Sequence, residues 1–393
     1  MKNLRRYFAR HWQSMLLVIM IFGLAALLYW YGVKTFLPGF SSAEVQTITQ
    51  TSSWKDIATN PLWLPLKLIY LSLHSLQVDP FSFRYVSGLF AMLSVFAFYS
   101  LSSRWYSQRV SALTTILFGT SVTTIAIARV ATPAILLYSW LWCIALIVWF
   151  QKSRHTRTAP LILLFFSAFM LYTPGFVWFT LILALWFSRE IPLIFKHMKQ
   201  SWIILGAITG IVFVVPLVYS FIQDPKLIKS WLLLPPTLDI KASLIYLKEL
   251  PSAFLYRSDV NPVYNLGRLP LFDAMTGTLL LLGLYAYRVR FKLNRTVIYI
   301  VSFALSLTLA ALNRNQIYLI FCLPFLYLLV GEGISYLLGQ WRSVFPRNPI
   351  ARFFGTLLMT IAILAASWYH IERYFLAFTN NPETKKVYSQ TID

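Results

Sequence analysis

The chain has 393 residues, of which 58% are hydrophobic and only 12% are charged. Soluble domains carry about 25% charged residues, so this composition excludes an ordinary soluble globule, which could not cover so much apolar surface. The mean hydropathy of +0.65 excludes a disordered chain, and the two cysteines exclude a disulfide scaffold. We therefore predict an all-α polytopic membrane protein, since only helices and closed barrels satisfy their backbone in lipid.

Apolar runs long enough to cross about 30 Å of hydrocarbon recur along the chain. One further run, 159–187, has 29 residues, and a single helix of that length would span about 43 Å. Basic residues flank it on both sides, at 152–157 and 189–199, which requires an even number of passes. We predict two short helices that turn at Tyr172–Gly175, and about 11 transmembrane helices in total. The other nine predicted spans are 15–35, 85–103, 110–128, 132–150, 202–222, 270–287, 296–312, 316–338 and 354–372.

The net charge of +21 follows the predicted topology. With the N-terminus cytoplasmic, the short inner loops carry 19 of the 34 basic residues beside one acid, Glu190. This asymmetry obeys the positive-inside rule and places the C-terminus outside the cytoplasm. The charge therefore gives no reason to expect nucleic-acid binding. We expect one transmembrane domain over 1–376 and a short polar extracytoplasmic tail over 377–393, frayed in solution.

Two outer loops, 36–84 and 223–269, are much longer than the inner loops, and long loops in compact proteins are usually functional. In the first loop, an apolar stretch from Pro61 to about Val78 places Lys67 and His74 on one helical face. This pattern predicts a helix that lies in the outer interface. The alternative is a helix buried by packing.

Three ionisable residues lie at the outer ends of predicted spans: Glu44, Arg129 and Arg314. Each arginine alone is typical of an interfacial anchor. Together, an acid and two guanidiniums on one membrane face indicate a site for a lipid-phosphate donor, because the planar guanidinium binds phosphate through two hydrogen bonds. We predict that Arg129 and Arg314 meet at one donor phosphate.

The sequence names no cofactor. Cys143 and Cys322 both fall inside predicted spans and the five histidines are scattered, so nothing indicates a metal site, although a divalent metal is compatible with the chemistry. Glu332 lies within a span, where an acid is normally paired. We expect its partner to be Ser335 or a group on a neighbouring helix.

Several short motifs, in order, resemble the GT-C membrane glycosyltransferases. The resemblance is closest to the branch of dolichyl-phosphate-mannose protein mannosyltransferases and lipid A aminoarabinose transferases, that is, to glycosyltransferase family 39. It covers roughly 1–340. The residues that carry it are Ala43-Glu44 after the first span, Asn60-Pro61-Leu62-Trp63, Phe83-Arg84-Tyr85-Val86-Ser87-Gly88-Leu89, Ala128-Arg129-Val130-Ala131-Thr132-Pro133, Asp259-Val260-Asn261-Pro262-Val263-Tyr264-Asn265-Leu266, Pro270-Leu271-Phe272-Asp273, and Asn313-Arg314-Asn315-Gln316-Ile317-Tyr318 with Leu323-Pro324.

This resemblance implies that one sugar is transferred from a polyprenyl-phosphate carrier to a lipid, glycan or protein acceptor at the outer face of a bacterial inner membrane. In the family, an Asp-Glu pair in the first outer loop carries the chemistry. Here the pair reads Ala43-Glu44, and Ala134 stands where a second-loop acid often follows.

Three alternatives therefore stay open: Glu44 is the base, Asp56 or Asp259 replaces it, or the chain is a non-catalytic relative or a lipid-binding scaffold. The absence of an internal repeat argues against a transporter. We expect Asn60, Trp63, Asn261, Tyr264 and Tyr318 to line the substrate groove.

Overall fold

The computed structural model describes residues 2–152, 159–186 and 200–392, and in these ranges the chain is helical with no strand. An isolated bridge joins Phe40 to Gln390. The helices are α1 (Lys2–Trp30), α2 (Val33–Phe36), α3 (Ser42–Thr49), α4 (Trp54–Thr59), α5 (Leu64–Ser75), α6 (Ser82–Trp105), α7 (Gln108–Thr120), α8 (Val122–Ala128), η1 (Pro133–Tyr138), α9 (Ser139–Lys152), α10 (Ala159–Met170), α11 (Phe176–Trp186), α13 (Gln200–Gln223), α14 (Lys226–Trp231), α15 (Ile240–Leu255), α16 (Ala274–Tyr287), η2 (Arg288–Arg290), α17 (Asn294–Asn313), η3 (Gln316–Phe321), α18 (Leu323–Val344), α19 (Pro349–Glu372), the π-helix η4 (Arg373–Phe378) and α20 (Pro382–Val387).

The prediction of an all-α membrane protein is confirmed. In the described ranges, five helical segments are long and apolar enough to cross a membrane, and the bent pair α7–α8, with an angle of 58° between its helices, makes up to six. The five are Leu16–Phe36, Ser82–Trp105, Ile204–Gln223, Arg295–Asn313 and Pro349–Phe378. The count of about 11 passes stays a prediction, as does the side on which each terminus lies.

The long run 159–187 is divided into two short helices, as predicted. Helix α10 ends at Met170 and α11 begins at Phe176. Between them Gly175 has φ +76°, and a Cβ there would lie 2.5 Å from Leu233 Cδ1, so both the turn and its packing favour glycine. Most of the basic residues that flank this hairpin, those at 153–158 and 187–199, lie outside the described residues.

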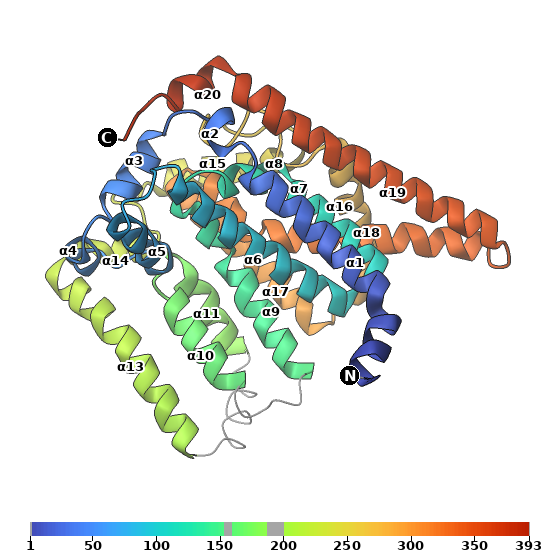
Figure 1. The fold of residues 1–393 in the computed structure, drawn as a ribbon, viewed down its shortest axis with the longest axis horizontal. Helices are drawn as coiled ribbons and strands as arrows, with labels where there is room; N and C mark the ends of the chain where they lie inside the picture. Colours follow the sequence, from blue (N-terminus) through green and yellow to red (C-terminus); the bar gives the residue numbers. More distant parts are fainter. Residues whose placement is uncertain (1, 153–158, 187–199, 393) are drawn as a thin grey trace.

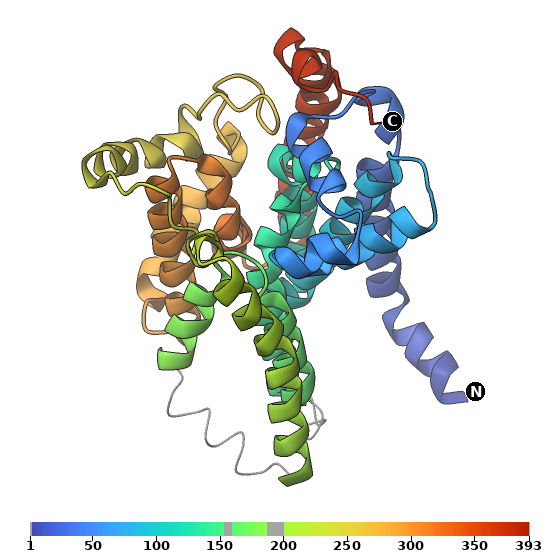
Figure 2. The ribbon, with the colours of Figure 1, turned by 90° about the vertical axis from the view of Figure 1, so that its left-hand side faces the viewer.

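The helices of the two outer loops gather at one end of the helix bundle. Figure 1 shows α2 to α5, α14 and α20 toward one end of the bundle, while the N-terminal part of α1 lies toward the opposite end. In Figure 2 the yellow loop that follows α15 lies at the same upper end as α20 and the C-terminus. The two long loops therefore lie at the same end of the bundle.

Two helices of the bundle core approach unusually closely. A Cβ at Gly283 of α16 would lie 1.9 Å from the carbonyl oxygen of Leu329, and a Cβ at Gly333 of α18 would lie 2.0 Å from that of Leu279. Small residues at a helix crossing allow such backbone contact in membranes. The contact fixes α16, whose N-terminal end follows the second outer loop, against α18.

Glu332 is paired across helices rather than with Ser335. Its Oε1 accepts a hydrogen bond from Arg290 Nη1 at 2.6 Å, and Arg295 Nη2 lies 3.7 Å from its Oε2. We expected Glu332 to pair with Ser335 or with a group on a neighbouring helix, and the second alternative is confirmed. These contacts join α18 to η2 and to the start of α17.

The tail after 377 is ordered, so the expectation of a frayed end is wrong. Tyr388 is buried and its hydroxyl donates to the carbonyl of Val263 at 2.8 Å. Phe40 and Gln390 exchange backbone hydrogen bonds of 2.8 and 3.2 Å. The tail therefore connects the first outer loop to the second.

Candidate functional site

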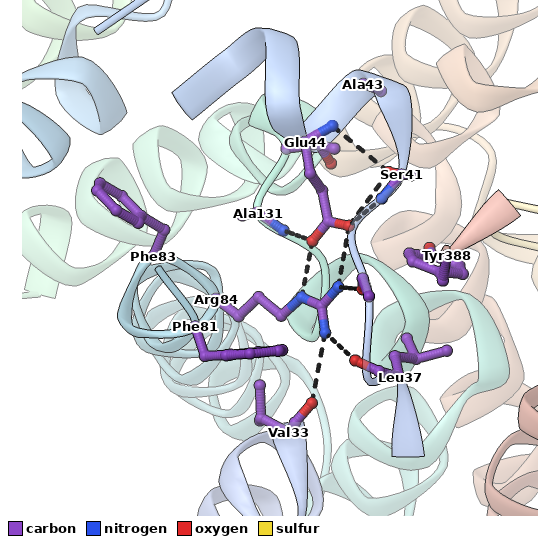
Figure 3. A network of polar contacts seen from close by, with 12 residues as sticks. Val33, Leu37, Ser41, Ala43, Glu44, Phe81, Phe83, Arg84, Ala131 and Tyr388 are labelled. Carbon is purple, nitrogen blue, oxygen red and sulfur yellow. Dashed lines mark hydrogen bonds and ion pairs between the residues drawn. The ribbon is translucent and has the colours of Figure 1, made fainter. Parts of the chain in front are cut away.

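Glu44 lies at the start of α3 inside a closed network of hydrogen bonds (Figure 3). Ser41 and Glu44 form a capping box, in which the Ser41 amide donates to Glu44 Oε2 at 2.9 Å. Arg84 Nε and the Ala131 amide each donate to Oε1 at 2.8 Å, and Arg84 Nη2 donates to Oε2 at 3.0 Å. Glu44 and Arg84 are both 0% exposed, so this carboxylate has no oxygen facing solvent or a cavity.

Arg84 is the residue that the sequence did not identify as functional, although it stands in the Phe83–Leu89 motif. Beyond Glu44, its Nη1 donates to the carbonyl of Leu37 at 2.6 Å and its Nη2 to that of Gly39 at 2.5 Å. The guanidinium also lies 4.7 Å from the ring centre of Phe40. Arg84 thus fixes the chain between the first span and α3, which is the segment that positions the outer loop.

Asp56, one of the two alternative acids, is also a capping residue. Its Oδ2 accepts from the Ser53 amide at 2.9 Å and from the Ser53 hydroxyl at 2.7 Å, closing the start of α4. These hydrogen bonds, with a third from Ser52, lower the pKa of the Asp56 carboxyl. The pattern Ser-x-x-Asp or Ser-x-x-Glu is visible in the sequence at both positions and is the signal that separates cap acids from candidate bases.

Asp259, the other alternative, faces a cavity of about 220 Å³. The Tyr246 hydroxyl donates to its Oδ2, and its backbone amide donates to Gln316 Oε1 at 3.0 Å. No hydrogen bond from a described residue occupies its Oδ1. The cavity is lined by Thr123, Asp259, Val260, Asn261, Tyr264, Asn265, Leu271, Arg314, Asn315, Gln316, Ile317, Leu319, Ile320 and Leu323.

Arg314, at the C-cap of α17, also lines this cavity. Its backbone is in the left-handed region with φ +48°, which is uncommon for a residue other than glycine and clusters at functional sites. Its side chain is exposed, and its guanidinium forms no ion pair with any described acid. An unpaired guanidinium and a carboxylate with one free oxygen therefore share one cavity.

The loop that carries Asp259 is held rigidly. The Ser258 hydroxyl donates to Gln316 Oε1 at 2.6 Å and accepts from Asn265 Nδ2 at 3.0 Å. The hydroxyls of Tyr264 and Thr132 lie 3.0 Å apart, and burial raises the pKa of Tyr264 to about 12. Because Thr132 follows Ala131, the cavity wall is connected through two residues to the Glu44 network.

Arg129 has different surroundings from Arg314. Its Nη1 donates to the carbonyls of Leu28 and Tyr31, each at 2.8 Å, and its guanidinium lies 4.8 Å from the ring centre of Phe375. It is 1% exposed and is not among the residues that line the cavity. In this geometry Arg129 clamps the outer end of α1, and the structure does not bring the two arginines to one pocket.

The residues predicted to line the groove do not lie together, and only two of the five line the cavity. Asn261 and Tyr264 line the cavity, whereas Tyr318 belongs to η3 without lining it. Trp63 donates its backbone amide to the Tyr172 carbonyl at 2.8 Å, and the carbonyl of Asn60 accepts from Lys67 Nζ at 2.6 Å. Trp63 therefore joins the α4–α5 turn to the hairpin turn, and Asn60 joins it to α5.

Lys67 is buried beneath the α4–α5 turn. Its helix, α5, exists as predicted, and Lys67 and His74 both reach inward, His74 Nε2 lying 2.9 Å from the carbonyl oxygen of Ile48. Burial lowers the pKa of the Lys67 ammonium to about 8. The interfacial position of α5 stays a prediction.

Ala43 and Ala134, which stand where the resembling glycosyltransferases have acids, lie in different surroundings. Ala43 is exposed on α3 beside Glu44, so no carboxylate projects from this position (Figure 3). Ala134 is buried in η1. In the described part of the chain, no group of three or more His, Cys, Asp or Glu residues is arranged to hold a metal ion.

No protein-family model matches the sequence, and no curated protein matches it. Solved structures do match. The chain is similar to ArnT from Cupriavidus metallidurans in the apo state, with a TM-score of 0.61 and 13% identity over 96% of this chain and 78% of that one. It is also similar to the same protein bound to undecaprenyl phosphate, with a TM-score of 0.53 and 12% identity over 94% of this chain and 76% of that one. The chain thus shares the fold of these two structures, which is the fold that the order of the motifs predicted.

Proposed function

We propose that the chain transfers a sugar from a polyprenyl-phosphate donor to an acceptor hydroxyl at the extracytoplasmic face of a bacterial inner membrane. The observation that carries the proposal is the juxtaposition of Asp259 and Arg314 in one cavity, whose lining comes mainly from the second outer loop and the segment around η3. The fold supports it, because one of the similar solved structures is bound to undecaprenyl phosphate. A polyprenyl-phosphate sugar presents the two groups that this cavity suits, a phosphate and a ring of hydroxyls.

In the proposed reaction, Asp259 is the general base. Its free Oδ1 takes the proton of the acceptor hydroxyl while the acceptor oxygen forms a bond to the anomeric carbon of the donor. The bond from that carbon to the phosphate oxygen breaks, and its electron pair leaves with the polyprenyl phosphate. The anomeric configuration is inverted. One carboxylate suffices, because a phosphate leaves without the protonation that a sugar alkoxide requires.

Arg314 is proposed to bind the donor phosphate and to stabilise the charge that develops on it. A guanidinium offers two parallel N–H donors to a phosphate, a geometry that lysine cannot reproduce. It is already unpaired, so no internal ion pair has to break when the phosphate enters. The Tyr246 hydroxyl orients the Asp259 carboxylate by holding Oδ2.

Glu44 and Arg129 are proposed as positioning residues. Their polar contacts are made within the protein, to Arg84, Ser41 and backbone groups for Glu44, and to the carbonyls of α1 and the residue after it for Arg129. Glu44 holds the amide of Ala131, whose neighbour Thr132 contacts the cavity-lining Tyr264. Arg129 follows α8, which carries the cavity-lining Thr123. Their loss should lower stability first and activity through misplacement of the loops.

The second candidate function is a non-catalytic relative that binds a lipid without turnover. It is favoured by Ala43, which leaves α3 without the acid that the family motif has there. This reading and the leading one differ in whether any product forms.

The test is transfer of radiolabelled sugar from polyprenyl-phosphate sugars by the purified chain in nanodiscs, with a membrane extract as acceptor. Asp259→Asn should reduce the rate by roughly 10²–10⁴-fold. The matched control is Glu249→Gln, which changes an exposed acid of α15 and should leave the rate within twofold of the parent. Equal rates for the parent and Asp259→Asn would remove Asp259 from the mechanism.

A further inference from the structure

A second, more open groove lies on the outer face beside the cavity that holds Asp259. It has a volume of about 580 Å³ and is lined by Tyr256, Arg257, Leu266, Gly267, Arg268, Leu269 and Asn381. Six of these residues belong to the loop after α15, and Asn381 comes from the ordered tail. The groove is therefore built by two segments that are far apart in the sequence.

The charge of this groove is uncompensated. Arg257 and Arg268 are both exposed, no acid is among the lining residues, and neither guanidinium is bonded to another described residue. Basic residues near the cytoplasmic ends of spans are explained by topology, but these two lie at the end of the bundle predicted to be extracytoplasmic. Two unpaired guanidiniums in one groove suit an anion, which each can hold through charge-assisted hydrogen bonds.

An exposed aromatic ring adjoins the arginines. Tyr256 is 80% exposed, an unusual exposure for so large a side chain. Its ring offers a flat apolar face next to a hydroxyl, which suits a ligand that is partly apolar and partly polar. A sugar ring has these properties, so the groove combines a surface for a sugar with a site for an anionic group.

The groove and the cavity share one short segment. The Ser258 amide donates to the carbonyl of Arg268 at 3.1 Å and closes the loop at its base. Arg257 precedes Ser258 and lines the groove, whereas Asp259 follows it and lines the cavity. The Cα atoms of residues two apart are separated by at most about 7 Å, so an anion in the groove lies within a few sugar rings of Asp259.

We propose that this groove binds an anionic group on the acceptor, so that the acceptor is an acidic glycan whose carboxylate or phosphate is held by Arg257 and Arg268 while a hydroxyl reaches Asp259. This inference rests on the proposed function, because that function makes the bound glycan the acceptor, but the binding itself does not require turnover. The arginines bind and orient the acceptor and take no part in the proton transfer. Neutral glycans of the same length lack the group that the groove holds.

Binding to the detergent-solubilised full chain tests the proposal, with trigalacturonate as the carboxylate probe, glucose 6-phosphate as the phosphate probe and maltotriose as the neutral control. At least one acidic probe should bind, and the double variant Arg257→Gln/Arg268→Gln should weaken that binding by about 10- to 100-fold. The matched control Lys241→Gln/Lys248→Gln removes two charges from the exposed face of α15 and should change it by less than twofold. A parent protein that binds an acidic probe but transfers no sugar would count against the proposed reaction and not against this inference, because binding requires no turnover.

Three results would overturn the proposal. The first is that the arginine variant binds the acidic probes as tightly as the parent does, or that the lysine variant weakens this binding as much as the arginine variant does. Either outcome would indicate unspecific charge attraction. The second is failure of both acidic probes to bind better than maltotriose. The third is an arginine variant that binds the soluble probes as the parent does but no longer binds nanodiscs rich in phosphatidylglycerol. This result would make the groove a lipid-headgroup site.

Discussion

The buried pair of Glu44 and Arg84 gives the sharpest stability prediction. Glu44→Gln keeps the size of the side chain but leaves the Arg84 guanidinium, 0% exposed, without its counter-charge. Breaking a buried pair by removing one partner costs about 3–5 kcal/mol. Arg84 keeps hydrogen bonds to the carbonyls of Leu37 and Gly39, so we expect the lower end, about 3 kcal/mol of unfolding free energy.

Unfolding by SDS titration in mixed micelles measures this loss, with Glu249→Gln as a control that makes the same chemical change at an exposed site and should stay within about 0.5 kcal/mol of the parent. Adding Arg84→Met to Glu44→Gln removes the stranded charge, so the double variant should be less destabilised than the sum of the two single variants. A Glu44→Gln protein that is as stable as the parent and yet loses turnover by 10²-fold or more would refute the structural role and make Glu44 the base.

Four further predictions concern single features of the molecule. Arg314→Lys should weaken binding of undecaprenyl phosphate with little change in unfolding free energy, because lysine keeps the charge and loses the paired donors. A titration with the lipid measures the affinity, and an unchanged affinity would contradict the prediction. Gly283→Ala should destabilise the fold by about 1–3 kcal/mol, since its Cβ meets the Leu329 carbonyl at 1.9 Å, whereas Gly339→Ala, where a Cβ meets nothing within 4 Å, is the neutral control. The pKa of Lys67 is lowered from 10.5 to about 8, so the folded chain releases this proton at a lower pH than the unfolded chain does. The unfolding free energy should therefore rise between about pH 8 and 10.5, and Lys67→Met should remove that rise. An equal slope of unfolding free energy against pH in both proteins would count against the burial of the charge. Truncation after Asn381 should lower the unfolding temperature and increase protease cleavage in the loop 36–41, because it removes the Gln390 partner of Phe40; cleavage equal to that of the full chain would show that the tail does not hold the loop.

The sequence predicted what depends on local patterns. Apolar runs identified the helices, Pro174-Gly175 located the hairpin turn, and the apolar stretch after Pro61 located α5. The motif order predicted the fold, which the similarity to ArnT bears out.

Contacts between residues that are distant in the sequence could not be predicted from it. Arg84 meets Glu44 across 40 positions, and Arg129 meets the end of α1 across about 100, so no local spacing reveals either contact. The assignment of Glu44 as a candidate base came from its place in the chain, whereas the choice of Asp259 comes from the cavity. The Ser41-x-x-Glu44 pattern was the one local sign that this acid serves as a cap.

The measurement that tests the central claim most directly is the release of free polyprenyl phosphate from a polyprenyl-phosphate sugar by three purified proteins: the parent, Asp259→Asn and Ala43→Asp. We predict clear turnover by the parent, a loss of about 10²-fold or more in Asp259→Asn, and no gain beyond a few-fold in Ala43→Asp, because the base is already present in the cavity. An inactive parent that becomes active when Ala43 is replaced by Asp would contradict the account, since it would show that the missing acid of α3, and not Asp259, is the residue that the chemistry needs.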